Sequence, residues 1–457
     1  MKYVWGILTL LYLANTVNSQ TGHLYVDGKN LKSTTGNTII LRGVNAGIAE
    51  DGNIDISNTA QCQAYIDQIA LTGANSIRFT WYTDGVSWRD GGQYVQQSPT
   101  PQARYNKGNG TVMKGYLENG HLGNIFSYCH SKNIIPILSI HDLTCANDWD
   151  YFNNDFSDWW TKPSVISFIQ QHQQYMIINL ANEMGSVNYL GGGQTHVDLF
   201  RNNYNTLIAE MRALGVTVPI MVDAPDCGQS STELLSIAES MNASDPSHNL
   251  MFSAHGYWSV YAPNQAAVEA KLDVAVNTNA CFLLGEVANL QAGPPNYVCA
   301  ETDISALYPI ILTEACSRNI GWMAWVWDQD CEPARKLSTN GQFNNLTPYG
   351  NDIVNNANYG LKSAGSCAAV LPTMSVGGSI SGNHVSAYPN PASDFIRVKG
   401  LPEEVKAIYE LIDLSGRKVY QQQFMGSVIE ISLSGISSGF YTMTRNGVAI
   451  QKVVVSR

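Results

Sequence analysis

Eight short apolar segments recur between residues 20 and 366, and each has the length of one β-strand. They lie at residues 42–45, 76–81, 134–140, 176–181, 219–222, 251–254, 281–285 and 320–327. Helical spacing of apolar residues separates several of them, at residues 60–71, 122–131, 197–214 and 266–277. Strands that are apolar on both faces are typical of parallel sheets covered by helices. Eight such units predict an α/β chain folded as a (β/α)8 TIM barrel.

A doubly wound open sheet is the alternative arrangement of such strands and helices. Its nucleotide-binding turn, GxGxxG between a strand and a helix, does not occur in this sequence. The barrel is therefore the favoured interpretation. Residues 24–31 and 38–41 precede the first barrel strand and predict a hairpin that forms a lid.

Polar or aromatic side chains follow six of the predicted strands. Active sites of (β/α)8 barrels lie at the C-terminal ends of the strands. These ends carry Arg78, His141 with Asp142, Asn182 with Glu183, His255 with Tyr257, Glu286, and Trp325. Either glutamate alone could be a solvated carboxylate at a strand end. Two glutamates on two strands, 103 residues apart, are the minimum set for cleaving a glycosidic bond.

The motifs around these residues resemble glycoside hydrolase family 5 over about residues 22–366. They are Ile77-Arg78, Ser139-Ile-His141, Ile178-Asn-Leu-Ala-Asn-Glu183, His255-Gly-Tyr257, Gly285-Glu286 and Gly321-Trp-Met-Ala-Trp325. The resemblance implies a retaining hydrolase in which Glu183 is the acid/base and Glu286 the nucleophile. Met184 follows Glu183 where the family commonly has proline, and Val287 follows Glu286 where it often has an aromatic residue or glycine. These departures leave the subfamily, and with it the sugar, open.

The two roles need opposite protonation states. Glu183 has to hold a proton for the leaving oxygen, so we expect burial and the neighbouring nucleophile to raise its pKa. Glu286 has to stay ionised, and Arg78 is the cation expected to keep it so. A purely structural ion pair is the alternative for Arg78.

Five further residues are expected to bind the substrate or to orient the two glutamates. Asn182 can donate a hydrogen bond to the sugar 2-hydroxyl, and Tyr257 can orient Glu286. His141 and His255 are expected to bind hydroxyl groups or to orient their neighbours. Trp325 offers an apolar face to the sugar. A strand-end cap, satisfied core histidines and core packing are the respective alternatives.

Several aromatic residues near the strand ends could stack on a polysaccharide or pack in the core. They are Trp81, Tyr82, Trp88, Trp149 to Phe152, Trp159, Trp160, Trp258 and Tyr261. The segments IHDLT, IINLANE and GWMAWVW, with Trp159-Trp160, look most like the bacterial β-mannanases of the family. Cellulose or mixed-linkage β-glucan is the second candidate substrate, with nearly equal support.

The composition changes near residue 365. All tryptophans and cysteines precede Val370, and residues 382–457 have eight Lys/Arg and six Asp/Glu, a net charge of +2 within a total of −11. Residues 367–383 are expected to be a linker rich in glycine and serine. Short alternating strands at residues 395–399, 407–412, 428–432, 441–443 and 449–455 predict a small C-terminal β-sandwich over residues 384–457.

The motifs of this tail resemble the C-terminal sorting domain of the Bacteroidetes type 9 (Por) secretion system. They are Tyr388-Pro-Asn-Pro-Ala-Ser393, Leu414-Ser-Gly-Arg-Lys418, Gly439-Phe-Tyr441 and Val453-Val-Val-Ser. The resemblance implies a secreted or surface-attached protein, with the secretion machinery as a partner. A carbohydrate-binding module is the alternative, but the tail lacks the aromatic platform that stacking on sugars favours.

The remaining sequence features set the location and exclude some partners. Residues 1–19 predict a signal peptide, and residues 20–366 would then be the catalytic domain. The net charge of −11 argues against nucleic acid, and no apolar segment is long enough to span a membrane. Nine cysteines leave the disulfide pairing open and show no CxxC-type metal spacing. We expect no metal, no cofactor and a monomer.

Together these features predict a secreted retaining endo-β-1,4-glycanase that hydrolyses plant cell-wall polysaccharide, with β-mannan preferred slightly over β-glucan. Two interpretations from other classes remain. One is a non-catalytic glycan-binding surface protein, although a binder has no reason to keep both glutamates. The other is an adhesion or structural protein, which rests only on the sorting tail.

Overall fold

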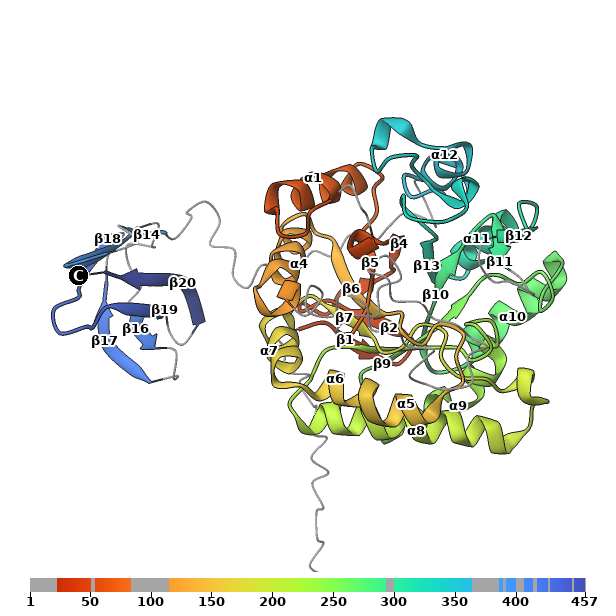
Figure 1. Ribbon diagram of the computed structural model, residues 1–457, viewed down its shortest axis with the longest axis horizontal. Coiled ribbons are helices and arrows are strands. Elements are labelled where there is room, and N and C mark those ends of the chain that lie inside the picture. Colours follow the sequence, from red (N-terminus) through yellow and green to blue (C-terminus); the bar gives the residue numbers. More distant parts are fainter. Residues whose placement is uncertain are drawn as a thin grey trace, which may run out of the picture. The chain divides into compact units, whose positions relative to one another are not determined.

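The eight predicted barrel strands form one closed parallel barrel (Figure 1). They are β4 (Arg42–Ala46), β5 (Ser76–Trp81), β6 (Ile135–Ile140), β7 (Ile177–Asn179), β8 (Ile220–Asp223), β9 (Leu250–His255), β10 (Cys281–Val287) and β13 (Gly321–Ala324). Strand β13 pairs with both β10 and β4, and this closes the ring. The predicted (β/α)8 fold is confirmed.

This computed structural model describes residues 23–50, 54–83, 115–292, 300–363, 386–388, 392–399, 407–413, 417–425, 428–445 and 448–456. The chain divides into two units, Met1–Met374 and Ser375–Arg457. The predicted signal peptide, the linker at residues 367–383 and Trp88 lie outside the described residues. No helix within the described part is long and apolar enough to cross a membrane.

Helices surround the barrel because each presents one apolar stripe to the strands. Four were predicted, namely α1 (Thr59–Ala70), α4 (His121–Ser131), α8 (Gln194–Ala213) and α10 (Gln265–Asn277). The others include α7 (Pro163–His172), α9 (Ser231–Ser244), α11 (Tyr308–Ser317) and α12 (Pro348–Asn355). Helix α8 illustrates the pattern, since it buries Val197, Phe200, Tyr204, Leu207, Ile208 and Met211. This spacing of three and four residues places all six on one face.

The N-terminal hairpin does not cover the predicted site. It forms a small sheet of β1 (Tyr25–Asp27), β2 (Asn30–Lys32) and β3 (Thr38–Ile39). The backbone N–H of Val26 donates to Asn249 Oδ1 at 2.8 Å, and Asn249 directly precedes β9. The sheet therefore lies at the N-terminal ends of the strands, where parallel geometry puts it opposite the predicted site. The predicted hairpin is therefore present, and it lies at this end of the barrel.

Most of the candidate aromatic platforms are core residues. Trp81, Trp160 and Trp258 are almost completely buried, and Trp160 Nε1 donates to the carbonyl of Leu180 at 3.2 Å. Trp149 packs edge-on against Phe152, Phe200 and Tyr204 between α8 and the irregular segment that contains α5 (Trp149–Tyr151) and α6 (Ser157–Thr161). These aromatic rings stabilise the barrel and its loops, so they are not stacking surfaces for a polysaccharide.

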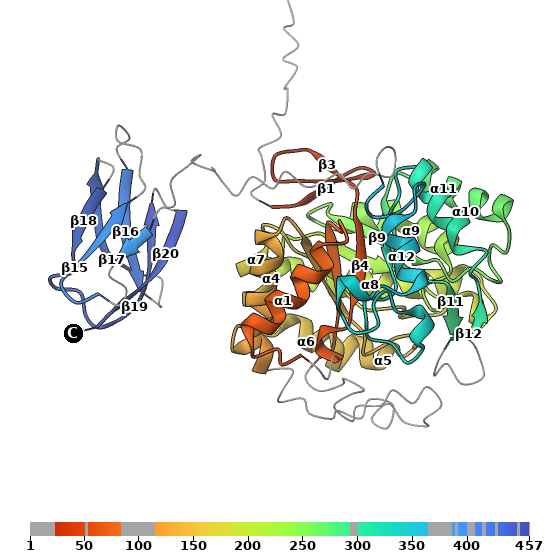
Figure 2. The same ribbon diagram turned by 90° about the horizontal axis from the view of Figure 1, so that it is seen from above.

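The C-terminal unit has two antiparallel sheets (Figure 2). One contains β14 (Ser386–Tyr388), β15 (Phe395–Lys399) and β18 (Val428–Ser432), and the other contains β17 (Lys418–Phe424), β16 (Ala407–Asp413), β19 (Gly439–Arg445) and β20 (Val448–Val455). Alternating residues such as Ile429 and Ile431 point into a core that is separate from the barrel core. This arrangement is consistent with the predicted sandwich. Strands β14 and β17 were not predicted.

Deletion of residues 382–457 should leave the barrel folded and active, because the two units have separate apolar cores. We expect the thermal midpoint of the barrel to change by less than about 2 °C. Calorimetry and glycan hydrolysis of the truncated protein, compared with the full chain, measure this. A large loss in either measurement would show that the barrel depends on the tail.

Candidate active site

The fully buried Arg78 guanidinium lies at the centre of the candidate site, on β5. Its Nη1 donates to Glu286 Oε1 at 2.8 Å, and its Nη2 donates to Asn182 Oδ1 at 2.6 Å. Its remaining partners are Asn45 Oδ1 at 2.9 Å, Asn179 Oδ1 at 2.7 and 2.9 Å, and Asp223 Oδ2 at 3.2 Å. A buried charge is tolerated when its donors are satisfied and opposite charge is near, and Arg78 meets both conditions.

Glu286 accepts hydrogen bonds on both carboxyl oxygens. Arg78 binds Oε1, and the Tyr257 hydroxyl donates to Oε2 at 2.9 Å. Burial and the nearby Glu183 raise the pKa of Glu286, whereas the Arg78 charge and the Tyr257 hydroxyl act in the opposite direction. Because hydrogen bonds and positive charge favour the ionised form, Glu286 is the group of the pair that is held as a carboxylate.

Glu183 lies directly beyond β7 in a different environment. Its Oε1 is 2.6 Å from His255 Nδ1, and its backbone adopts the left-handed region at φ 54°. Burial and the nearby Asp223 carboxylate raise the pKa of Glu183 to about 8. Burial also lowers the pKa of His255, so the imidazole is neutral. Glu183 is therefore protonated at neutral pH.

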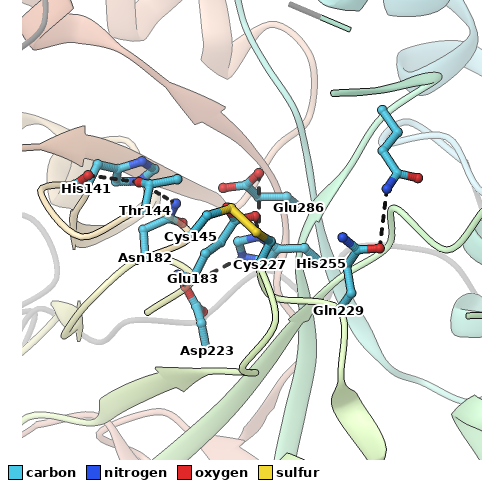
Figure 3. Close-up of a disulfide and its surroundings, with 11 residues drawn as sticks. His141, Thr144, Cys145, Asn182, Glu183, Asp223, Cys227, Gln229, His255 and Glu286 are labelled. Carbon is cyan, nitrogen blue, oxygen red and sulfur yellow. Dashed lines mark hydrogen bonds and ion pairs between the residues drawn. A yellow bond between two sulfur atoms is a disulfide. The ribbon is translucent and has the colours of Figure 1, made fainter. Parts of the chain in front are cut away.

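The two glutamates lie close together, from strand ends on β7 and β10 (Figure 3). One oxygen of each, together with a nitrogen of His255, lie within 4.8 Å of one another. By distance alone this trio could hold a metal ion. However, Arg78 already places a positive charge on Glu286, and a second cation there would be repelled. The trio suits proton transfer better than metal binding.

His141 and Trp325 form the neighbouring part of the site. Their rings are stacked with centroids 6.1 Å apart, and the Trp325 indole N–H donates to Asp330 Oδ2 at 2.6 Å. Burial keeps the pKa of His141 well below its usual value. Its Nε2 is buried and has no hydrogen-bond partner among the described residues.

Thr144 connects His141 to Asn182, the residue before Glu183, as Figure 3 shows. Asn182 Nδ2 donates to Thr144 Oγ1 at 3.0 Å, and Thr144 Oγ1 donates to the His141 carbonyl at 2.8 Å. The structure thus brings all eight predicted site residues to one end of the barrel. They are Arg78, His141, Asn182, Glu183, His255, Tyr257, Glu286 and Trp325.

Asn45, Asn179 and Asp223 also contact Arg78, and sequence reasoning missed them. Asp223 directly follows the predicted strand at residues 219–222, and Asn45 ends the strand at residues 42–45. Applying the strand-end rule to these two strands as well would have found both. Asn179 is the last residue of β7, but it lies inside the predicted strand at residues 176–181, so the strand-end rule would not have found it.

A disulfide between Cys145 and Cys227 also lies at the site and was not predicted. Its two cysteines follow β6 and β8, the strands on either side of β7. Cys62, Cys129 and Cys281 are free and buried.

A (β/α)8 barrel with one protonated and one arginine-bound glutamate at its C-terminal strand ends has the site of a glycoside hydrolase. Residues 33–330 match the family model described as Cellulase (glycosyl hydrolase family 5). The chain belongs to this family. Residues 386–456 match the secretion system C-terminal sorting domain, so this glycoside hydrolase is secreted or attached to the cell surface.

Known relatives of the chain carry mannanase names. A mannan endo-1,4-beta-mannosidase of Cellvibrio japonicus is 28% identical, with 77% of this chain and 70% of that protein covered. The Streptomyces lividans protein of the same name is 26% identical, with 76% and 85% covered. The mannanase catalytic domain of Streptomyces sp. SirexAA-E shares the fold with a TM-score of 0.56 and 23% identity, covering 82% of this chain and 99% of that one.

The substitution Asp223→Asn should move the alkaline limb of activity to lower pH. Asp223 raises the pKa of Glu183, so if Glu183 acts as the proton donor, activity should fall above about pH 8 in the parent. Removing one neighbouring charge should shift this limb downward by about one pH unit. The profile of kcat/KM on soluble galactomannan or glucan between pH 5 and pH 10 measures the shift.

Asp245→Asn is the matched control for this variant. Asp245 is also a buried carboxylate paired with an arginine, Arg212, at 2.8 Å, but it precedes β9 at the opposite end of the barrel. The Asp245→Asn substitution should lower the stability of the protein without moving the alkaline limb of its pH–activity profile. An unmoved limb in Asp223→Asn would mean that Glu183 is not the titrating acid.

Proposed function

We propose that this protein is a retaining endo-β-1,4-mannanase in which Glu183 is the general acid/base and Glu286 is the nucleophile. This proposal rests on two carboxyl groups that have opposite environments and lie close together. One oxygen of Glu183 and one oxygen of Glu286 are within 4.8 Å of each other. Retaining glycosidases place their carboxyl groups about 5–5.5 Å apart, and inverting enzymes place them about 6.5–9.5 Å apart to admit water. The short separation therefore supports retention.

The first step forms a covalent glycosyl-enzyme. Glu286, oriented by Arg78 and Tyr257, attacks the anomeric carbon while Glu183 gives its proton to the leaving oxygen. The Asn182 amide, fixed by Arg78 and Thr144, is placed to donate to the sugar 2-hydroxyl as positive charge develops on the ring. Trp325 supplies an apolar surface beside the sugar, and His141 Nε2 can bind a hydroxyl.

The second step hydrolyses this intermediate. Glu183 is now ionised and removes a proton from water, which attacks the anomeric carbon and releases Glu286. His255 stays in contact with Glu183 Oε1. Because its imidazole is neutral, its Nδ1 can accept a hydrogen bond from the protonated carboxyl group or, in the other tautomer, donate one to the carboxylate. All steps use side chains of this chain, and the proposed mechanism needs no cofactor and no second subunit.

The relatives named mannan endo-1,4-beta-mannosidase favour β-mannan as the substrate. The mannanase-like segments around His141, Glu183 and Trp325 support the same choice. Endo-β-1,4-glucanase activity is the second candidate. A non-catalytic glycan-binding protein is disfavoured because the network around Arg78 keeps the two glutamates in different protonation states, which binding alone does not require.

The substrate class can be tested with a panel of galactomannan, glucomannan, carboxymethylcellulose and lichenan. We expect fastest release of reducing ends from the two mannan-containing polymers, with oligosaccharides of several lengths as early products. Rates and product lengths measure both preference and endo action. Faster cleavage of carboxymethylcellulose or lichenan would assign the enzyme to β-glucan, and no cleavage of any polymer would favour the binding protein.

Azide should distinguish the roles of the two glutamates. In Glu183→Ala, an aryl β-glycoside with a good leaving group should still form the glycosyl-enzyme, while polysaccharide turnover should fall by about 10²–10⁴-fold. Azide needs no general base, so it should restore turnover and give the β-glycosyl azide.

In Glu286→Ala, azide should instead enter from the vacated face and give the α-glycosyl azide. NMR of the isolated product identifies the anomer in each variant. An α-azide from Glu183→Ala would mean that the two roles are reversed.

A further inference from the structure

We propose that the Cys145–Cys227 disulfide is a positioning element for the acid/base Glu183, which it clamps and shields from water. This inference rests on the proposed function of Glu183. The disulfide joins the segment after β6 to the segment after β8, and Glu183 lies on the strand end between them (Figure 3). The bridge therefore crosses over the acid/base and connects the two neighbouring strand ends.

One sulfur contacts the carboxyl group directly. Cys145 Sγ lies 3.1 Å from Glu183 Oε2, while the other oxygen, Oε1, contacts His255. A disulfide sulfur has no proton to donate and accepts hydrogen bonds only weakly. It therefore takes the place of water at Oε2 without stabilising negative charge there. This contact contributes to the burial that keeps Glu183 protonated.

The backbone after Glu183 is held from both sides beneath the bridge. The N–H of Gly185 donates to the carbonyl of Ala146 at 2.7 Å, and the N–H of Asp226 donates to the carbonyl of Gly185 at 2.8 Å. Ala146 and Asp226 are the chain neighbours of the two cysteines. The disulfide and these two hydrogen bonds thus close a ring that passes through Gly185, two residues after Glu183.

The Asp226 carboxylate extends this clamp along the next residues. Its two oxygens accept from the N–H groups of Val187, Asn188 and Tyr189 at 2.8, 2.9 and 3.1 Å. Cys145, Glu183, Asp226 and Cys227 all have left-handed backbones, with φ of 56°, 54°, 59° and 54°. Such conformations are uncommon outside glycine and persist where the surroundings enforce them.

Gly228, the residue directly after Cys227, also packs against His255. A Cβ atom at Gly228 would meet the His255 ring at 2.6 Å, so only glycine fits there. The N–H of His255 donates to the carbonyl of Gly228 at 2.7 Å. Opening the disulfide should therefore loosen both groups that contact Glu183, the sulfur at Oε2 and the imidazole at Oε1.

The test is the double variant Cys145→Ala with Cys227→Ala in the full chain, because alanine, unlike serine, brings no new hydrogen-bond donor to Glu183 Oε2. Water should reach Glu183 Oε2, so we expect the alkaline limb of kcat/KM to move down by about one pH unit. Galactomannan needs protonation of its leaving group, whereas a 2,4-dinitrophenyl β-mannobioside does not. The loss in kcat/KM should thus be at least about tenfold larger on the polysaccharide.

Asp245→Asn serves again as the control for lost stability. One outcome is that the double alanine variant loses thermal stability but keeps the parent pH profile and the parent ratio of the two substrates, as Asp245→Asn should. In that case the disulfide is only structural and the proposal is wrong. If the variant does not fold, the folded parent is reduced with dithiothreitol, which is oxidised in exchange, and mass spectrometry verifies that Cys145 and Cys227 are opened. The pH profile of kcat/KM and the ratio of kcat/KM on the two substrates are then measured on the reduced protein, with the same criteria.

A direct titration separates this proposal from the proposed function. Carbon-13 NMR of labelled glutamate carboxyl groups, assigned with Glu183→Gln, reports the pKa of Glu183 without any substrate. A fall of about one unit in the pKa of Glu183 in the alanine variant supports the clamp even if the parent cleaves no glycan, which would refute only the proposed function. An unchanged pKa would refute the clamp.

Discussion

The buried charge of Arg78 is the constraint on which the rest of the site depends. A buried guanidinium group needs a nearby opposite charge and hydrogen-bond partners for its N–H groups. The barrel provides both from strands that are distant in sequence. Asn45 on β4, Asn179 on β7, Asp223 on β8 and Glu286 on β10 all bind it. Arg78 thereby fixes the relative positions of four strand ends, including the one that carries the candidate nucleophile.

The sequence was sufficient for the barrel because its pattern follows from burial. Strands buried on both faces have to be apolar throughout, and helices on the outside have to be apolar on one face. Most of the eight barrel strands therefore appeared as largely apolar segments, whereas β4 has arginine and asparagine among its five residues. The site residues were found for a related reason, since parallel strands of a barrel bring their C-terminal ends together. Residues as distant as Arg78 and Glu286 could thus be assigned to one site.

The features that the sequence did not reveal depend on which way a side chain or hairpin points and on which cysteines pair. An aromatic residue near a strand end has the same letter whether its ring faces solvent or the core, so the burial of Trp160 and Trp258 could not be predicted. The hairpin at β1–β3 could equally have covered either end of the barrel. The pairing of Cys145 with Cys227 depends on the spatial order of β6, β7 and β8, and nine cysteines allow many alternatives.

Charge balance links the two proposed steps of catalysis. Arg78 has two carboxylate partners, Glu286 and Asp223, so ionised Glu183 would be a third negative charge in a buried site. This favours the protonated acid that the first step needs. Once Glu286 becomes an uncharged ester in the glycosyl-enzyme, one negative charge disappears, and the pKa of Glu183 should fall. The carboxyl group that had to donate a proton then becomes the carboxylate that accepts one from water. Because neighbouring carboxyl groups titrate as a coupled pair, the proposed covalent step would itself convert Glu183 from acid to base.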